Sequence, residues 1–291
     1  MLFQGIRDLL DPACIRLHQS TTMKNITPMD RRNTLKLLGA VALGLSLPVV
    51  ASQSTDKVPI DAMAPEDADD TLSATPAVAC RIIGVGEAGC NIVLAGWSSG
   101  VLHASDCQAD FACVSMGWQS IRDAISANRR SPWNAPIRTV QLGRYGAGGN
   151  IKVACAAARK HDKTLRSLID GADVVILVAG IGGGTGSAVA PILASLAEES
   201  GAMVLGVIVT PFRWELGRYP NAFAAVKALE RHSHYLATLS NNVVADLSGK
   251  HATLDDLMAQ QELLGTACIR RLITDAALAL RPHRGGRSMT T

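Results

Sequence analysis

The chain has 291 residues, which is enough for one large domain or two small ones, and hydrophobic residues make up 48% of it. Its formal net charge of +3 comes without a basic tract interleaved with aromatic residues, so nucleic acid is not an expected partner. The seven cysteines show no metal-site spacing, and their odd number argues against a complete disulfide framework. Four of them lie in apolar stretches and are expected in the core: Cys80, Cys113, Cys155 and Cys268.

The first 78 residues lack the patterning of a globular domain. Arg31 and Arg32 precede an apolar run over residues 37–50, and small residues follow it at a possible cleavage site. This layout is typical of a signal peptide, and the paired arginines partly resemble the twin-arginine export motif, although Thr34 stands where an aromatic residue is usual. The run is short for a membrane span. We keep three alternatives open: a working export signal, an uncleaved membrane-associated segment, and a leader without a targeting role.

The composition divides the rest of the chain. Residues 1–51 form the leader, within which Met23 is an alternative start, and residues 52–78 are rich in Asp, Ala, Pro, Ser and Thr, as in a disordered linker. Residues 79–280 alternate strand-like and helix-like segments, and residues 281–291 are expected to form a frayed tail.

The alternation within residues 79–280 predicts the order of the elements. Strands are expected at 78–83, 111–115, 137–141, 173–178, 202–210 and near 238–245. Helices are expected from about 91 to 99, at 121–127, from 150 to near 171, at 188–199, at 219–238 and at roughly 253–280. Because strands alternate with helices, the predicted fold is α/β, with a doubly wound, mostly parallel and Rossmann-like sheet.

The most informative segment is the glycine run between a predicted strand and a predicted helix, at residues 179–188. Such a turn presents backbone N–H groups and a positive helix end to an anion, usually phosphate. Thr185 and Ser187 add hydroxyl groups. No Gly-Lys-Ser/Thr follows, so the run is not a Walker loop.

Two further glycine-rich loops, at 84–91 and 146–150, also follow predicted strands, and ligands of such sheets bind beyond the carboxyl ends of the strands. The GxGxxG spacing at 84–89 alone is compatible with a dinucleotide-dependent oxidoreductase, in which Asp106 or Asp110 would hold the ribose. That interpretation leaves the other two loops without a role.

Together these loops resemble the tubulin/FtsZ family. The run 182–187 is similar to its signature loop, with Ala188 in place of a last glycine, and residues 211–215 resemble its Pro-Phe-x-Phe-Glu segment. The resemblance implies GTP or GDP as ligand, possible Mg²⁺, Glu215 on the ribose and Asn241 or Asn242 on the base. It implies these nucleotide-binding residues: Gly84, Gly86, Glu87, Ala88, Gly89, Cys90, Asn91, Gly146, Ala147, Gly148, Gly182, Gly183, Gly184, Thr185, Gly186, Ser187, Glu215, Arg218 and Asn241.

Three departures from the family pattern bear on function. The family's Asn-Thr-Asp run aligns with residues 115–117, where no carboxylate stands. Glu87 occupies a loop position that is usually glycine, and a carboxylate there repels phosphates unless it points away or a Mg²⁺ lies between. The aspartate by which the family reads guanine would align near Gln260, Gln261 or Glu262.

The resemblance also predicts what lies beyond the nucleotide site. The family continues after its central helix, here 263–280, into a loop with catalytic acidic residues and a second domain, neither of which is expected in this chain. The resemblance therefore implies a slow GTPase, or none without a partner subunit, and no catalytic residue is assigned. Without a second domain, residues 263–280 are expected to expose an apolar face: Leu263, Leu264, Ala267, Ile269, Leu272, Ile273, Ala276 and Leu280.

That face would bind an FtsZ-like subunit or a second copy of the chain, so the alternative function is a nucleotide-independent scaffold or filament-capping protein. Use of GTP implies a cytoplasmic or inner-membrane-associated protein, whereas a working signal at Arg31-Arg32 implies a periplasmic one.

Overall fold

The computed structural model describes residues 15–18, 78–102, 107–130, 136–249 and 251–280. The predicted export signal, the tail and the linker up to residue 77 lie outside these residues. In the part of the chain that is described, no helix combines the length and the apolar character needed to cross a membrane.

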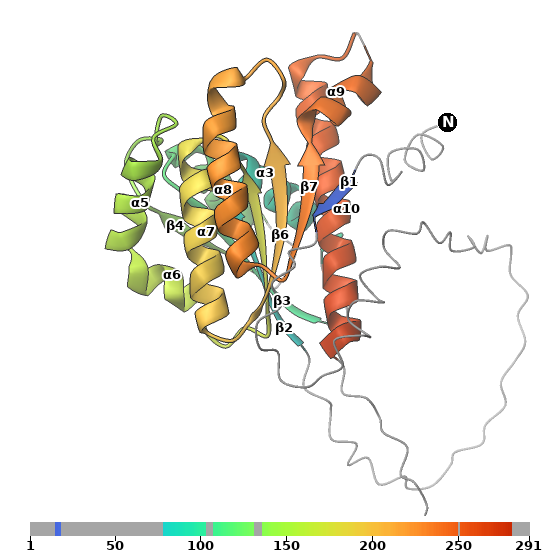
Figure 1. Cartoon of the computed structure of the whole chain (residues 1–291). Coiled ribbons are helices and arrows are strands. Elements are labelled where there is room, and N and C mark those ends of the chain that lie inside the picture. The colour runs from blue at the N-terminus through green and yellow to red at the C-terminus, as the bar shows by residue number, and fades with distance from the viewer. Residues whose placement is uncertain (1–14, 19–77, 103–106, 131–135, 250, 281–291) are drawn as a thin grey trace, which may run out of the picture.

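One sheet organises the described residues, with the strand order β1-β7-β6-β5-β2-β3-β4 (Figure 1). All neighbouring pairs from β2 to β7 are parallel, which confirms the predicted doubly wound fold. A short strand, β1, adds antiparallel to β7 from within the leader, where the sequence pattern predicts no strand. The strand bounds are β1 (Ile15–His18), β2 (Val78–Val85), β3 (Cys107–Ser115), β4 (Ile137–Gln141), β5 (Val174–Gly180), β6 (Met203–Thr210) and β7 (Tyr235–Ser240).

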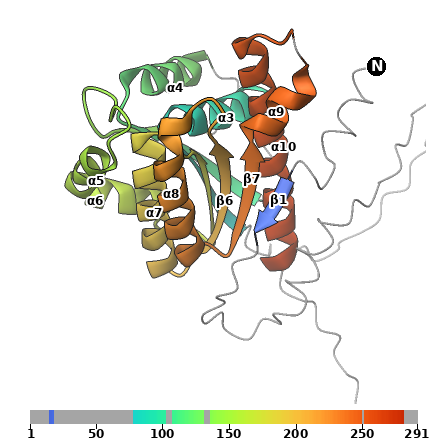
Figure 2. The same cartoon turned by 45° about the horizontal axis from the view of Figure 1, so that its top comes forward.

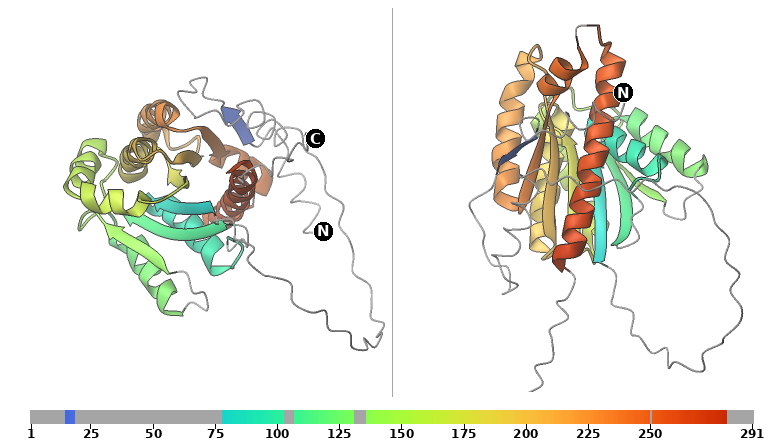
Figure 3. Two further views of the ribbon diagram at one scale, coloured as in Figure 1. Left: turned by 90° about the horizontal axis from the view of Figure 1, so that it is seen from below. Right: turned by 90° about the vertical axis from the view of Figure 1, so that its right-hand side faces the viewer.

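Helices cover both faces of the sheet (Figures 2 and 3). One face packs against α3 (Gly86–Ser98), α4 (Trp118–Arg130) and α10 (Leu254–Leu280). The other packs against α5 (Ile151–Lys160), α6 (Asp162–Ile169), α7 (Gly184–Glu199) and α8 (Tyr219–His232). The central strands β5 and β6 are therefore buried on both faces, which explains their nearly continuous apolar sequences. Among the four cysteines expected in the core, Cys80 and Cys113 are buried, and Cys155 and Cys268 are half-buried.

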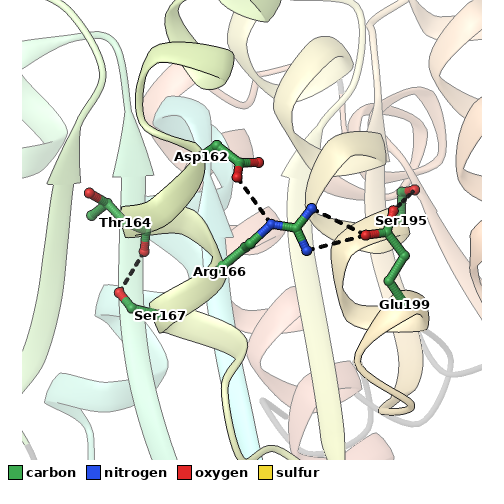
Figure 4. A network of polar contacts seen from close by, with 6 residues as sticks. All are labelled: Asp162, Thr164, Arg166, Ser167, Ser195 and Glu199. Carbon is green, nitrogen blue, oxygen red and sulfur yellow. Dashed lines mark hydrogen bonds and ion pairs between the residues drawn. The ribbon is translucent and has the colours of Figure 1, made fainter.

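Two predicted segments differ from the structure. The single helix expected from 150 to 171 is two helices, because His161 has non-helical dihedral angles (φ −108°, ψ 18°) between α5 and α6. On α6, Arg166 bridges Asp162 at 3.0 Å and Glu199 of α7 at 3.2 Å (Figure 4). The strand expected near 238–245 is β7, which ends at Ser240, and the short helix α9 (Asn241–Ser248) follows it.

Most of the apolar face predicted to be exposed on residues 263–280 is instead buried, and the prediction holds only for Leu263 and Ala267, which are exposed. Ile269, Leu272, Ile273 and Ala276 are at most 4% exposed and belong to the same core cluster as β2, β5 and α3. Leu263 is 51% exposed, as is Leu278, and Leu264 and Leu280 are half-buried. Because α10 packs along the sheet of its own domain, its apolar residues offer no continuous surface to a partner.

A buried histidine makes the stability of the fold depend on pH. His234 precedes β7, and its Nδ1 accepts a hydrogen bond from the backbone N–H of Val204 at 3.0 Å. Burial lowers the pKa of His234 below its ordinary value, so the unfolded chain binds the proton more readily than the folded one. We expect the contribution of His234 to the free energy of unfolding to be full above about pH 6.5 and to decline as the pH falls below that value.

The measurement is urea unfolding of the chain at about pH 7.5 and about pH 5.5, on either side of the ordinary histidine pKa. His234→Asn, whose Oδ1 can accept the same hydrogen bond, should reduce the loss of stability between the two pH values. The exposed His251 provides the control, and His251→Asn should leave that loss unchanged. An equal loss in the chain with His234→Asn would contradict the assignment.

Candidate functional site

A cleft of about 1140 Å³ opens at the edge of the sheet where the parallel strands end. Four of the predicted residues do not line it: Gly84, Gly89, Cys90 and Ser187. The other predicted residues do: Gly86, Glu87, Ala88, Asn91, Gly146, Ala147, Gly148, Gly182, Gly183, Gly184, Thr185, Gly186, Glu215, Arg218 and Asn241. The structure thus gathers the three glycine loops and residues 215–241 around one space.

The first loop turns from β2 directly into α3. Gly86 has φ +71°, and a Cβ there would lie 3.2 Å from the backbone nitrogen of Gly186, so the first and third loops touch. Gly89 serves a different purpose, because a Cβ on it would lie 2.1 Å from the carbonyl oxygen of Val178 in β5. The Cys90 thiol is buried and donates to the Gly84 carbonyl at 3.4 Å. Gly89 and Cys90 therefore pack α3 against the sheet and do not face the cleft.

The signature loop joins β5 to α7, and its two hydroxyl groups differ in place. Ser187 is 4% exposed, and its Oγ accepts a hydrogen bond from the backbone N–H of Gly182 at 2.7 Å. The Ser187 hydroxyl group therefore stabilises the loop by a hydrogen bond within it, whereas Thr185 lines the cleft. Gly183 is the N-cap of α7 and has no side chain to satisfy the first N–H groups of the helix. With α3, the loop brings two helix N-termini to one spot, which favours an anion there.

The middle loop closes against the signature loop. Gly148 and Gly149 have φ of +57° and +78°, and a Cβ on Gly184 would lie 2.6 Å from the Cβ of Ala147. Asn221 of α8 holds the two loops together: its Nδ2 donates to the carbonyl oxygen of Gly149 at 2.8 Å and to that of Gly182 at 3.3 Å. Sequence reasoning missed Asn221, because its partners are 72 and 39 positions away.

The segment after β6 forms another wall of the cleft. Phe212 stacks on Trp214 with ring centroids 4.3 Å apart, and Trp214 is 59% exposed. Glu215 accepts a hydrogen bond from the backbone N–H of Phe212 at 3.0 Å, and its other oxygen pairs with Arg218 at 3.2 Å. The predicted ribose-binding carboxylate is thus held in place within its own turn.

Amide side chains lie at the opposite end of the cleft from the glycine loops. Asn241 begins α9, is 7% exposed, and its buried Oδ1 has no hydrogen-bond partner among the described residues. Of the three residues considered for reading the base, Gln261 lines the cleft and Gln260 and Glu262 do not. Burial raises the pKa of the Glu262 carboxyl. Within the described part of the chain, the buried Oδ1 of Asn241 therefore lacks the hydrogen bond that a buried polar atom normally makes.

Metal ligands and a dinucleotide site have less support. No three His, Cys, Asp or Glu side chains in the described ranges gather closely enough to hold a metal ion. Ser115 and Gly117 line the cleft, and the Ser115 Oγ accepts a hydrogen bond from the Gly117 N–H at 3.1 Å. Asp110 lies five positions before the end of β3 and pairs with Arg81 at 2.7 Å, so it does not serve a ribose at the cleft; Asp106 lies outside the described residues.

Comparisons with known proteins agree with this geometry. The model of the Tubulin/FtsZ family, GTPase domain, matches residues 79–249. The cell division protein FtsZ 1 of Pyrococcus furiosus is 30% identical over 201 residues, which are 68% of this chain and 51% of that protein. The cell division protein FtsZ of Rickettsia typhi is 29% identical over 181 residues, 60% of this chain and 37% of that protein. The chain thus spans about half or less of the length of these relatives.

Solved structures share the fold. An empty FtsZ dimer of M. jannaschii superposes with a TM-score of 0.58 at 24% identity, covering 69% of this chain and 56% of the other. CetZ2 from Haloferax volcanii, solved as a GTPγS-bound protofilament, gives a TM-score of 0.56 at 22% identity, covering 69% of this chain and 58% of the other. Because the family model matches more than half of its residues, the chain belongs to the Tubulin/FtsZ family through its GTPase domain.

Proposed function

We propose that the chain binds a guanine nucleotide, GTP or GDP, in the cleft at the carboxyl edge of the sheet. The observation that carries the proposal is the contact of three glycine loops around two helix N-termini. Gly86 approaches the Gly186 nitrogen, and Gly184 approaches Ala147, so closely that side chains at Gly86 and Gly184 would meet the facing loop. Backbone N–H groups without helical partners then face the cleft, where a phosphate chain can accept their hydrogen bonds.

The remaining groups fit the other parts of a nucleotide. Glu215, fixed by Phe212 and Arg218, would accept from the ribose hydroxyls, and Asn241, which lines the cleft, would contact the base. Thr185 would add a hydroxyl at the phosphates. Mg²⁺ is commonly held by one or two carboxylates together with phosphate oxygens and water, and Glu87 in the first turn of α3 is placed for that role. The ion would neutralise the phosphate charge that Glu87 otherwise repels.

Hydrolysis is expected to be slow. Among the described residues that line the cleft, the carboxylates are Glu87 and Glu215, and Glu215 is occupied by its own turn. Because Glu87 is assigned to Mg²⁺, neither carboxylate is left as a base that could orient an attacking water. We therefore propose a nucleotide-binding protein whose turnover, if it hydrolyses GTP, depends on a group that another subunit provides.

Isothermal titration of the full chain with GTP and with GDP, with and without Mg²⁺, tests the proposal. The expected result is binding at micromolar or tighter dissociation constants for both nucleotides. The absence of binding heat, together with unchanged thermal stability in the presence of millimolar GTP, would overturn it. That outcome would favour the alternative of a nucleotide-independent scaffold.

A further inference from the structure

The inference concerns the middle loop, residues 146–150, and it rests on the proposed function because this loop borders the phosphate end of the cleft. The loop turns through Gly148 and Gly149, which both have positive φ. A Cβ on either glycine would meet nothing within 4 Å, so the space around the turn is open. A glycine turn in open space has much backbone freedom to lose, and a bound ligand can be what orders such a segment.

Protein groups hold both ends of this turn. Ala147, before the two glycines, is 9% exposed and belongs to the core cluster that includes residues of α5 and α7. After the glycines, the backbone N–H of Asn150 donates to the Ala147 carbonyl at 2.9 Å. The Asn150 side chain then caps α5 by accepting from the N–H groups of Lys152 and Val153. The glycine pair therefore lies between two anchored positions.

Asn221 ties the glycine pair to the signature loop. Its Nδ2 donates to the carbonyl oxygen of Gly149 at 2.8 Å and to that of Gly182 at 3.3 Å. The amide NH2 group carries two hydrogens, so each carbonyl can receive one. The amide cannot be turned over, because its Oδ1 would then face two carbonyl oxygens that offer it no hydrogen. With both hydrogens engaged by the loops, Asn221 has no donor left for a phosphate and acts through the loops alone.

The groups on the other side of this tie are held by the core. Asn221 is the third residue of α8, which packs beside α7 through buried residues that include Ala225 and Leu229 (Figure 2). Gly182 is fixed in turn, because its N–H donates to the buried Oγ of Ser187 at 2.7 Å. Asn221 therefore joins a turn of free backbone to the packed part of the domain.

We propose that Asn221 is a positioning residue that keeps the middle loop closed against the signature loop whichever nucleotide occupies the cleft, so that the loop does not open and close as GTP is exchanged for GDP. The closing hydrogen bonds come from the protein, so they persist when the terminal phosphate is lost. A preorganised loop also spares the nucleotide the cost of ordering it on binding. Without the Asn221 amide, the loop should close only around a nucleotide.

Hydrogen exchange of the full chain tests this role at the backbone amides of Asn150, Lys152 and Val153. These N–H groups donate to oxygens of Ala147 and Asn150, so their exchange rates report on closure of the loop and not on contact with a ligand. Without nucleotide, Asn221→Ala should raise the three rates about tenfold, the effect of losing hydrogen bonds of ordinary strength. Added nucleotide should lower them again in this variant, whereas in the unaltered chain GTP and GDP with Mg²⁺ should change them by less than about threefold.

Gln119→Ala is the matched control. Gln119 also lines the cleft, but its Nε2 donates to Asp123 on its own helix, so this substitution should leave the three rates unchanged. Equal rates in the unaltered chain and in Asn221→Ala without nucleotide would overturn the inference. Because that comparison needs no nucleotide, it is decided independently of the titration that tests the proposed function.

The response of the unaltered chain gives a second comparison, at nucleotide concentrations that fill the site in the titration. A slowing of the three amides beyond the stated limit, with either nucleotide, would show that the ligand closes the loop. That result would overturn the inference and leave the proposed function intact. If Asn221→Ala fails to fold, Asn221→Asp takes its place, because it has the same shape, its carboxylate cannot donate, and an acidic residue suits the first turn of a helix.

Discussion

Replacing Gly183 with aspartate is expected to weaken nucleotide binding at least hundredfold while the chain stays folded. Gly183 is the N-cap of α7, with φ −77° and ψ 177°, a conformation open to any residue. Gly183 lines the cleft, and a Cβ at this position meets nothing within 4 Å, so it displaces no protein atoms. Its carboxylate would occupy the helix N-terminus that we assign to phosphate. Two like charges about 4 Å apart repel by about 4 kcal/mol at an effective dielectric constant of about 20.

Gly183→Asn is the matched control, because asparagine has the same size and caps helices equally well but carries no charge. Isothermal titration with GTP should show the aspartate variant much weaker than the asparagine variant, and the gap should narrow as salt is added. The thermal midpoint of both variants without nucleotide should equal or slightly exceed that of the parent, since aspartate and asparagine cap α7 better than glycine. Equal affinity in the two variants would show that no anion binds at this helix end.

The double replacement Gly184→Val with Thr185→Ala is a less decisive test of phosphate binding than Gly183→Asp. A Cβ on Gly184 lies 2.6 Å from the Cβ of Ala147 and 3.0 Å from the nitrogen of Asn150. Valine would push the two loops apart whether or not a nucleotide binds there. Loss of binding in that variant is expected, but it would report on the packing of the loops as much as on phosphate contact.

The sheet, its layers and its glycine loops could be predicted from the sequence because local patterns specify them. The continuous apolar runs of β5 and β6 predict strands buried on both faces, and the glycines after β2 and β5 mark turns at one edge. These features need no knowledge of distant contacts. Element boundaries were less accurate: α8 ends at His232, six positions before the predicted end, because the following residues pair with β6.

Side-chain direction could not be predicted to the same extent. Thr185 and Ser187 are both hydroxyl residues in one loop. Yet Ser187, the fourth residue of α7, is buried and accepts a hydrogen bond from the N–H of Gly182, whereas Thr185 lines the cleft. Consecutive side chains on a helix point about 100° apart. Because the sequence places the start of a helix only to within a residue or two, it does not tell which of Gln260, Gln261 and Glu262 faces the cleft. Only the packing of α10 against α3 and the sheet sets Gln261 as the residue that faces the cleft.

The same limit explains the error over α10. The sequence shows an apolar stripe on residues 263–280 but not what covers it. In the structure the stripe faces α3 and the strands, and a Cβ on Gly265 would lie 2.6 Å from a methyl group of Ile92. The helix is therefore a core element of the GTPase domain itself.

Replacing Gly89 with alanine is expected to lower the stability of the fold by about 3 kcal/mol, the upper part of the usual range for overpacking a core. The added Cβ would lie 2.1 Å from the carbonyl oxygen of Val178 and 3.2 Å from the Cα of Ala179. Neither side can yield easily, because β5 is hydrogen-bonded between β2 and β6, and α3 is held between the sheet and α10. Thermal unfolding should show a midpoint lower by about 6–12 °C for a domain of this size.

Gly96→Ala provides the comparison within the same helix. There the new Cβ would lie 2.7 Å from Cδ1 of Leu102 and 2.9 Å from Cγ2 of Thr266, which are side-chain atoms rather than the backbone of a strand. Both substitutions gain about 1 kcal/mol of helix propensity, so the difference between them isolates what each Cβ meets. We expect Gly96→Ala to cost less than about 1 kcal/mol net. If the two variants unfolded at the same temperature, α3 would not sit against the backbone of β5 as closely as the structure places it, and the first glycine loop could not bring its N–H groups to the cleft.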